Sequence, residues 1–223
     1  MKFRHEFKHK ITVGEYITIR QRIEAICRRD ANTDDDGNYI IRSLYFDNFN
    51  DKALKEKIDG VNKREKFRIR YYNHNTDFIR LEKKSKINSL CLKQSSKINK
   101  HQVADIINGN YQFLLDPNNE LFTEFYSKIK GEFLKPRTIV DYSREAFIYD
   151  AGNVRITFDS DIRTGISSID FLNPYSPTIS IGSFTILEVK YDEFIPSVIL
   201  DAVQTGGQSS SAFSKYAGCR MYI

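Results

Sequence analysis

Hydrophobic and charged residues alternate between positions 66 and 72 and again between positions 79 and 86. Successive side chains of a β-strand point to opposite faces, so both segments predict strands with one apolar and one charged face. The polar link 74–77 is typical of a hairpin turn between them. The predicted charged face contains Lys66, Arg68, Arg70, Arg80, Glu82, Lys84 and Lys86, opposite Phe67, Ile69, Tyr71, Ile79 and Leu81.

Further segments show the same alternation or a helical period. Strands are predicted over residues 2–11, 39–47, 89–93, 138–149, 153–159 and 184–191. Helices are predicted from the capping box Thr12–Glu15 to about Arg29, over 50–59, 97–108 and 119–130, after Pro196, and in a short C-terminal segment that carries Ser214 and Lys215. Gly109 and Gly131 follow two of these helices in the position of C-terminal caps. Residues 34–38 and 206–211 are predicted to be a turn and a linker.

Composition limits the class of protein. Of 223 residues, 40% are hydrophobic and 13% aromatic, which excludes a disordered chain, and 34 Lys and Arg against 29 Asp and Glu give a net charge of +5. The three cysteines, Cys27, Cys91 and Cys219, fit no C-x-x-C pattern and are typical of reduced thiols. No signal-peptide pattern and no apolar run near the roughly 20 residues of a membrane span is present. We therefore expect a cytoplasmic protein with one domain over residues 1–223.

At least five predicted strands carry Lys or Arg on a polar face. A charged face of this kind is often simply the solvent-exposed side of a two-layer protein. A sheet of about eight strands must also protect its edges, and closure into a barrel does so. The apolar helix stripes would then cover the outside. This argument predicts an α+β fold with a closed antiparallel β-barrel tunnel, a basic lumen and helices packed outside.

A cationic lumen is costly without a ligand. Two like charges about 6 Å apart repel by roughly 3 kcal/mol at an effective dielectric constant of 20. A polyanion in the tunnel reverses the sign of this energy, because Arg and Lys bind phosphate strongly. Strand parity places Glu6, Glu82, Asp159 and Glu188 on the same faces, where they would hold a divalent cation against phosphates.

Eight short motifs occur in a fixed order along the chain. They are Arg4-x-Glu6-x-Lys8, Arg42-Ser43-Leu44-Tyr45-Phe46-Asp47, Phe67-Arg68-Ile69-Arg70, Glu82-Lys83-Lys84, Tyr142-Ser143-Arg144, Val154-Arg155-Ile156, Leu187-Glu188-Val189-Lys190 and Ser214-Lys215-Tyr216. The series resembles the vacuolar transporter chaperone (VTC) polyphosphate polymerase domain, a branch of the CYTH-like triphosphate tunnel metalloenzymes. The resemblance covers nearly the entire chain.

This resemblance implies an enzyme that transfers the γ-phosphate of ATP to a growing inorganic polyphosphate chain with Mn²⁺ or Mg²⁺. The implied phosphate ligands are Lys8, Arg68, Arg70, Lys84, Arg144, Arg155, Lys190 and Lys215. Tyr142 and Ser214 would add hydrogen bonds, and Glu188 would hold the metal. A membrane protein that receives the product is compatible with this activity, although no residue pattern identifies one.

The chain departs from the family pattern at two positions. Ala212 stands where eukaryotic members carry a further lysine, which removes one phosphate anchor. Arg4 replaces the first carboxylate of the Glu-x-Glu-x-Lys motif of relatives that hydrolyse triphosphates. The second departure removes a metal ligand and favours the polymerase branch.

Two other functions stay open at this point. The same tunnel would suit a hydrolase of tripolyphosphate or nucleoside triphosphates, or a non-catalytic module that stores or senses polyphosphate. Nucleic-acid binding is not expected, because most aromatic residues lie on the strand faces opposite the cations. The sequence contains no G-x-x-x-x-G-K-[ST] motif, which excludes a P-loop mechanism.

Overall fold

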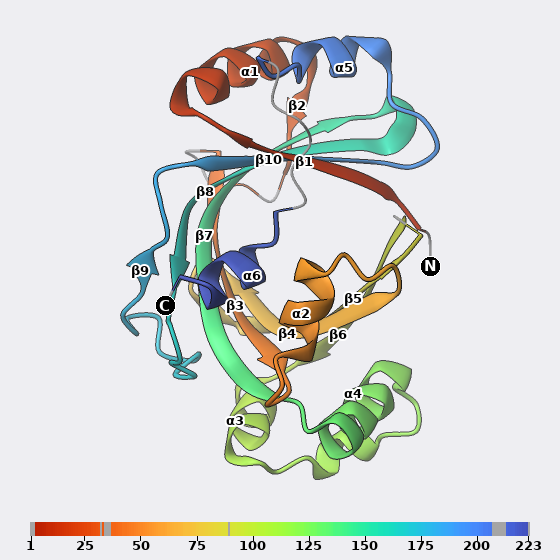
Figure 1. Cartoon of the computed structure of the whole chain (residues 1–223), viewed down its shortest axis with the longest axis vertical. Coiled ribbons are helices and arrows are strands. Elements are labelled where there is room, and N and C mark those ends of the chain that lie inside the picture. The colour runs from red at the N-terminus through yellow and green to blue at the C-terminus, as the bar shows by residue number, and fades with distance from the viewer. Residues whose placement is uncertain (1–2, 32, 34–36, 89, 207–212, 223) are drawn as a thin grey trace.

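The computed structural model describes residues 3–31, 33, 37–88, 90–206 and 213–222. Its centre is a curled antiparallel sheet whose main path runs β1-β10-β8-β7-β3-β4-β5-β6 (Figure 1). In that order the strands are β1 (His5–Ile11), β10 (Thr185–Tyr191), β8 (Val154–Thr164), β7 (Lys135–Tyr149), β3 (Asn38–Asp47), β4 (Arg64–Tyr72), β5 (Asn75–Ile87) and β6 (Leu90–Ile98). Two short strands, β2 (Arg28–Arg29) and β9 (Ile179–Ser180), pair with β7 and β8.

The sheet is a half-barrel, so the prediction of a closed barrel is wrong. The terminal strands β1 and β6 meet in the described residues only at an isolated bridge, where Arg4 and Cys91 exchange two backbone hydrogen bonds of 3.1 Å. Strand parity identifies the two faces of each strand, but it carries no information on whether the first and last strands pair over their length. Figure 1 shows two short helices, α2 (Lys52–Ile58) and α6 (Lys215–Arg220), in front of the curled sheet.

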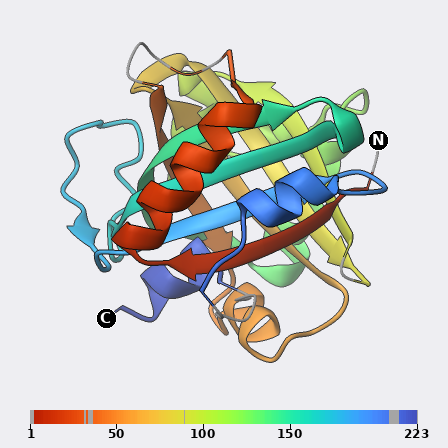
Figure 2. The same cartoon turned by 90° about the horizontal axis from the view of Figure 1, so that it is seen from above.

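The apolar strand faces pack under the other four α-helices. α1 (Val13–Ile26) and α5 (Ser197–Ala202) lie side by side over one end of the sheet, in red and blue in Figure 2, while α3 (Lys100–Asn108) and α4 (Glu120–Glu132) cover the other end. Short 3₁₀ turns occur at Gln112–Leu115 and Ala151–Asn153. None of the described helices is long and apolar enough to cross a membrane.

Two core clusters follow from the alternation. Phe67, Ile69 and Tyr71 of β4 pack with residues of α3 and α4, including Val103 and Phe125. On the other side Ile156 and Phe158 of β8 and Leu187 and Val189 of β10 pack with Ile19 and Ile23 of α1 and Ile199 of α5. Full burial of such side chains stabilises a fold by about 1.5–3 kcal/mol each, so these clusters hold the sheet in its curled shape.

Most predicted elements are present, with corrected ends. The capping box of α1 is confirmed, but this helix stops at Ile26 because Arg28 and Arg29 pair with β7. β6 extends to Ile98, so α3 begins later than expected. Gly109 caps α3 with φ +85° as predicted, whereas Gly131 lies inside α4, which ends at Glu132 and is capped by Phe133 with φ +58°. The predicted turn at 34–36, Ser89 and the linker residues 207–211 lie outside the described residues.

Candidate functional site

A cavity of about 1000 Å³ lies within the curled sheet. Side chains of all eight strands of the main path, together with residues of α2 and α6, line it. The structure brings together all eleven residues singled out from the sequence: Lys8, Arg68, Arg70, Lys84, Tyr142, Arg144, Arg155, Glu188, Lys190, Ser214 and Lys215. Their placement in one cavity is therefore a finding, while the role of each residue remains a prediction.

Arg68 and Arg70 of β4 are held by neighbouring strands. The Nη1 of Arg68 donates to the hydroxyl of Tyr45 at 2.9 Å, and its Nη2 lies 2.7 Å from the Glu82 carboxylate. The Nη2 of Arg70 donates to the hydroxyl of Tyr142 at 2.9 Å. Because these contacts fix both guanidinium groups, little side-chain entropy is lost when an anion binds them.

Asp159 holds two cations together at the base of the site. Its carboxylate is fully buried, lies 2.5 and 2.7 Å from Nε and Nη2 of Arg144, and forms an ion pair with Lys215. Burial raises the pKa of Asp159, but Arg144 and Lys215 outweigh it and lower the pKa to about 2. Both oxygens of Asp159 contact these cations, and its expected role beside a metal stays a prediction.

Lys8 lies between two carboxylates. Its Nζ is 3.1 Å from Oε1 of Glu6 and 2.9 Å from Oε2 of Glu188. Lys84 contacts the other oxygen of Glu6 at 2.6 Å, and Lys190 forms an ion pair with Glu188. Burial raises the pKa of Glu188, but Lys190 and Lys8 outweigh it and hold the pKa well below its usual range. Both carboxylates are therefore ionised components of a charged network.

This pair of carboxylates fits a divalent cation that is shared with phosphate. Among the residues that the structure describes, no group of three His, Cys, Asp or Glu side chains is arranged to hold a metal ion. A complete protein cage is thus absent from that part of the chain. Mg²⁺ commonly takes only one or two carboxylates and completes its shell with water and phosphate oxygens. Glu188, with Glu6 beside it, meets that requirement.

Arg155 occupies a separate position on the cavity wall. Its Nη2 contacts Asp30 at 2.6 Å and donates to the hydroxyl of Tyr39 at 2.8 Å. Tyr39 lines the cavity as well, so Arg155 is oriented by neighbours from outside β8.

The start of α6 is anchored from two sides. Ser214 caps this helix by accepting a hydrogen bond from the Ala217 amide, and the Tyr216 hydroxyl donates to the buried Asp47 at 2.6 Å. Asp47 also accepts from the amides of Ala53 and Leu54 in α2. This arrangement ties both short helices to β3 and positions Lys215 in the cavity.

Several lining residues were not among the predicted site residues. Tyr45 contacts Arg68, and burial raises the pKa of its hydroxyl while Arg68 and Lys66 outweigh this and lower it to about 7. Burial, with Lys84 and Lys8 nearby, lowers the pKa of Lys66 to about 7. Strand parity could have identified Lys66, whereas Lys57 lies on the helix α2 and has no such signal.

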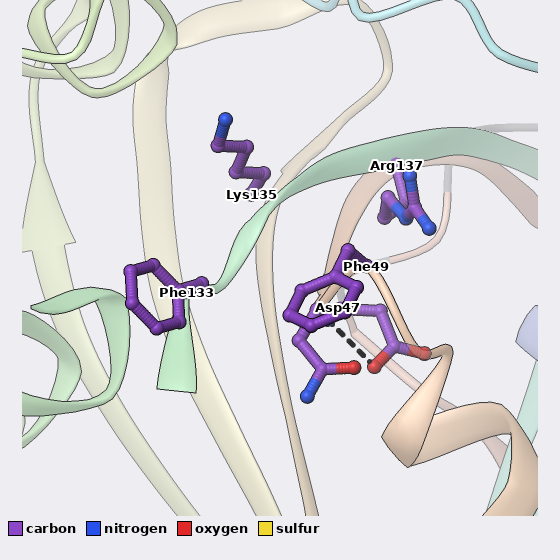
Figure 3. Close-up of a pocket in the computed structure, with 6 residues that line it drawn as sticks. Asp47, Phe49, Phe133, Lys135 and Arg137 are labelled. Atoms are coloured by element: carbon purple, nitrogen blue, oxygen red, sulfur yellow. Dashed lines mark hydrogen bonds between the residues drawn. The ribbon is translucent and has the colours of Figure 1, made fainter. Parts of the chain in front are cut away.

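A smaller pocket of about 230 Å³ lies elsewhere on the molecule (Figure 3). It is lined by Asp47, Asn48, Phe49, Phe133, Lys135 and Arg137, and it contains none of the predicted site residues. Figure 3 shows Phe49 over Asp47, with Phe133 on the far side. Asp47 is already bonded to α2 and Tyr216.

One known family model matches this chain, and several solved structures are similar to it. A family model described as the VTC domain matches residues 3–222. No curated protein matches the chain. Similar solved structures include the PH1819 protein of Pyrococcus horikoshii OT3, with 13% identity, 96% of each chain covered and a TM-score of 0.47. Another is a putative adenylate cyclase of Bacillus halodurans, with 12% identity, 85% of this chain and 80% of that chain covered, and a TM-score of 0.49.

The family model carries the assignment. It extends over nearly the whole chain, including every strand and helix that lines the cavity. The eleven predicted residues fall within the matched region. This chain belongs to the VTC domain family.

Proposed function

We propose that this protein is a metal-dependent polyphosphate polymerase that transfers the γ-phosphate of ATP to a growing inorganic polyphosphate chain. One observation carries the proposal: eight cationic side chains from six strands and α6 converge on a single cavity. A ligand that neutralises so many cations in a small volume must carry many negative charges, as polyphosphate and a nucleoside triphosphate do.

Phosphoryl transfer in this site would rest on positioning and charge neutralisation. A terminal oxygen of the acceptor chain attacks the γ-phosphorus, the bond from that phosphorus to the β–γ bridging oxygen breaks, and ADP leaves with the electron pair. The attacking oxygen is already largely ionised near neutral pH, so a general base is not required. Arg68 and Arg70, held by Glu82 and Tyr142, would stabilise the charge on the transferred group.

Glu188 is the proposed metal ligand. A bound Mn²⁺ or Mg²⁺ would supply charge neutralisation at the phosphate oxygens. The protein's own contribution is the ionised state of Glu188, which Lys190 and Lys8 maintain. The same lysines are available to phosphate once a cation takes over part of their interaction with Glu188.

Incubation of the purified protein with ATP and Mn²⁺, followed by gel electrophoresis of the products, tests the proposal. Long anionic polymer that disappears in Arg70→Gln is the expected result. Lys55→Gln, an exposed position on α2 outside the cavity, should behave as wild type. Free phosphate without polymer would replace the proposal with a tunnel triphosphatase. Tight binding of polyphosphate with neither product would indicate a storage or sensing module.

A further inference from the structure

Three pairs of like charges face each other across β4 and β5: Arg70 and Arg80 near the turn, and two pairs at the opposite end of the hairpin. The strand register places Arg64 opposite Lys86 and Lys66 opposite Lys84. All four side chains line the cavity, as does Lys57 of α2. Like charges directly opposite each other destabilise a sheet, so their presence calls for a function.

Among the described residues, four of these five cations form no ion pair with a carboxylate, and one of the four, Lys66, contacts the Ser214 hydroxyl at 3.4 Å. Within the described residues, no carboxylate forms an ion pair with Lys57, Arg64 or Lys86, whereas Lys84 contacts Glu6 at 2.6 Å. Burial, followed by the charges of Arg64 and Lys86, lowers the pKa of Lys57. These three residues therefore form one unneutralised group, which we name the Lys57–Arg64–Lys86 cluster.

The cluster lies at one end of the cavity. Lys86 is opposite Cys91 in the register of β5 and β6, next to the bridge between Cys91 and Arg4. The other end of the hairpin is the turn at Asn73 and His74. The cluster thus stands beyond the candidate site, on the side away from this turn.

One face of β4 connects the cluster to the site. Arg64, Lys66, Arg68 and Arg70 occupy every second position of β4, so neighbouring cations on this face are about 6.6 Å apart along the strand. The row spans roughly 20 Å, which is far longer than a triphosphate. A triphosphate held by Arg68 and Arg70 therefore leaves the cluster without a counter-charge, and only a longer linear anion reaches both.

We propose that the Lys57–Arg64–Lys86 cluster binds the part of a polyphosphate chain that extends beyond the phosphates held by Arg68 and Arg70, which gives the chain a fixed direction in the cavity. This inference rests on the proposed function, since it takes polyphosphate as the ligand of the site. It adds which end of the cavity the chain occupies.

Binding of two anions separates the cluster from the site. The triple variant Lys57→Gln, Arg64→Gln, Lys86→Gln is titrated calorimetrically with tripolyphosphate and with long-chain polyphosphate, without metal. Affinity for the long chain is expected to fall by about tenfold to a hundredfold, and affinity for tripolyphosphate by less than about twofold. The matched control Arg22→Gln, Lys55→Gln, Lys63→Gln removes the same charge at exposed positions outside the cavity and should leave both affinities unchanged.

Thermal unfolding without ligand gives an independent measurement. Removing the like charges should raise the melting temperature of the cluster variant above that of wild type, which also shows that the variant folds. Unchanged affinity for long polyphosphate, or equal losses for both anions, would overturn the inference while leaving the proposed function intact. Equally tight binding of a single-stranded oligonucleotide of the same charge would also overturn it. A wild-type protein that binds neither phosphate anion would overturn the proposed function and this inference together.

Discussion

The cavity contains two regions that carry positive charge in different ways. In the paired region each cation contacts a carboxylate, as Arg144 does with Asp159 and Arg68 with Glu82. In the Lys57–Arg64–Lys86 cluster the described part of the chain supplies no such partner. Both regions line the same cavity, yet only the paired region is electrostatically complete before a ligand binds.

This difference implies that the paired region contributes to the stability of the folded protein, whereas the cluster contributes to ligand binding. Ion pairs of the paired region stabilise the arrangement of the side chains in the empty protein, so the phosphate ligands are preorganised. The cluster has the opposite property, because its mutual repulsion is relieved only by an external anion. Substitutions in the paired region should therefore affect stability and turnover, whereas substitutions in the cluster should affect mainly the binding of long chains.

The largest effect is expected for Asp159→Asn. The change leaves Arg144 and Lys215 buried without a counter-charge, and breaking a buried pair in this way costs about 3–5 kcal/mol of unfolding free energy. Urea denaturation followed by circular dichroism measures the loss. Asp161→Asn, two residues along β8 at an exposed carboxylate, should cost less than about 1 kcal/mol. Similar small losses in both variants would contradict the distinction between the two regions.

A smaller but more specific effect is expected for Glu188→Gln. Metal-dependent turnover should fall about a hundredfold or more, because the proposed metal ligand is lost. Tripolyphosphate binding without metal should be retained or tighter, since Lys8 and Lys190 lose their carboxylate partner. Product formation and calorimetry measure the two quantities, with Glu120→Gln on the exposed start of α4 as the control. Turnover at the wild-type rate would mean that Glu188 is not the ligand.

Lys66 lies between the two regions, and its substitution should have a moderate effect. Its pKa of about 7 means that the empty protein is only partly protonated there near neutral pH. Tyr45, Arg68, Lys84 and Lys8 surround it, and Ser214 lies 3.4 Å from its Nζ. An anion would raise this pKa, so binding should take up protons near pH 7, and affinity should fall as the pH rises further.

Lys66→Met tests this coupling. Tripolyphosphate affinity at pH 7 should fall by about threefold to tenfold, and the proton uptake, measured by calorimetry in buffers of different ionisation enthalpy, should decrease. The folded pKa lies below that of the unfolded chain, so wild-type stability should rise as the pH increases above about 7. In Lys66→Met, the increase in stability that comes from deprotonation of Lys66 above about pH 7 should be absent. Equal proton uptake in both proteins would exclude Lys66 as the titrating group.

The sequence alone assigns residues to one or the other face of each strand. It does not show which strands and helices lie next to each other in the fold. A side-chain period of two is a local property, so Arg68, Arg144 and Glu188 could be assigned to the polar side of their strands without coordinates. The residue opposite each cation depends on register. The turn at Asn73 and His74, both with positive φ, and the irregularity between Arg70 and Tyr72 together set the register of β4 and β5, whereas the sequence predicted a longer link at 74–77.

Longer-range features were beyond the sequence for a related reason. The meeting of β1 and β6 at Arg4 and Cys91 depends on the accumulated curl of the whole sheet, which no local pattern encodes. Lys57 enters the cavity from α2, and the position of that helix depends on its bonds to Asp47. Both features decide where the unneutralised cations lie, so the cluster could be found only in the structure.

The smallest change is expected for Lys86→Glu, which acts on the cluster alone. It converts the like-charge pair with Arg64 into an opposite-charge pair, and such a change across two strands is worth about 0.5–1 kcal/mol. The empty variant should therefore unfold at higher urea concentration than wild type, while its affinity for long polyphosphate falls and its affinity for tripolyphosphate does not. Lys63→Glu, exposed and outside the cavity, controls for net charge. Lys86→Glu could gain stability and still bind long polyphosphate as tightly as wild type. This result would show that the like charges of Arg64 and Lys86 do not contribute to polyphosphate binding.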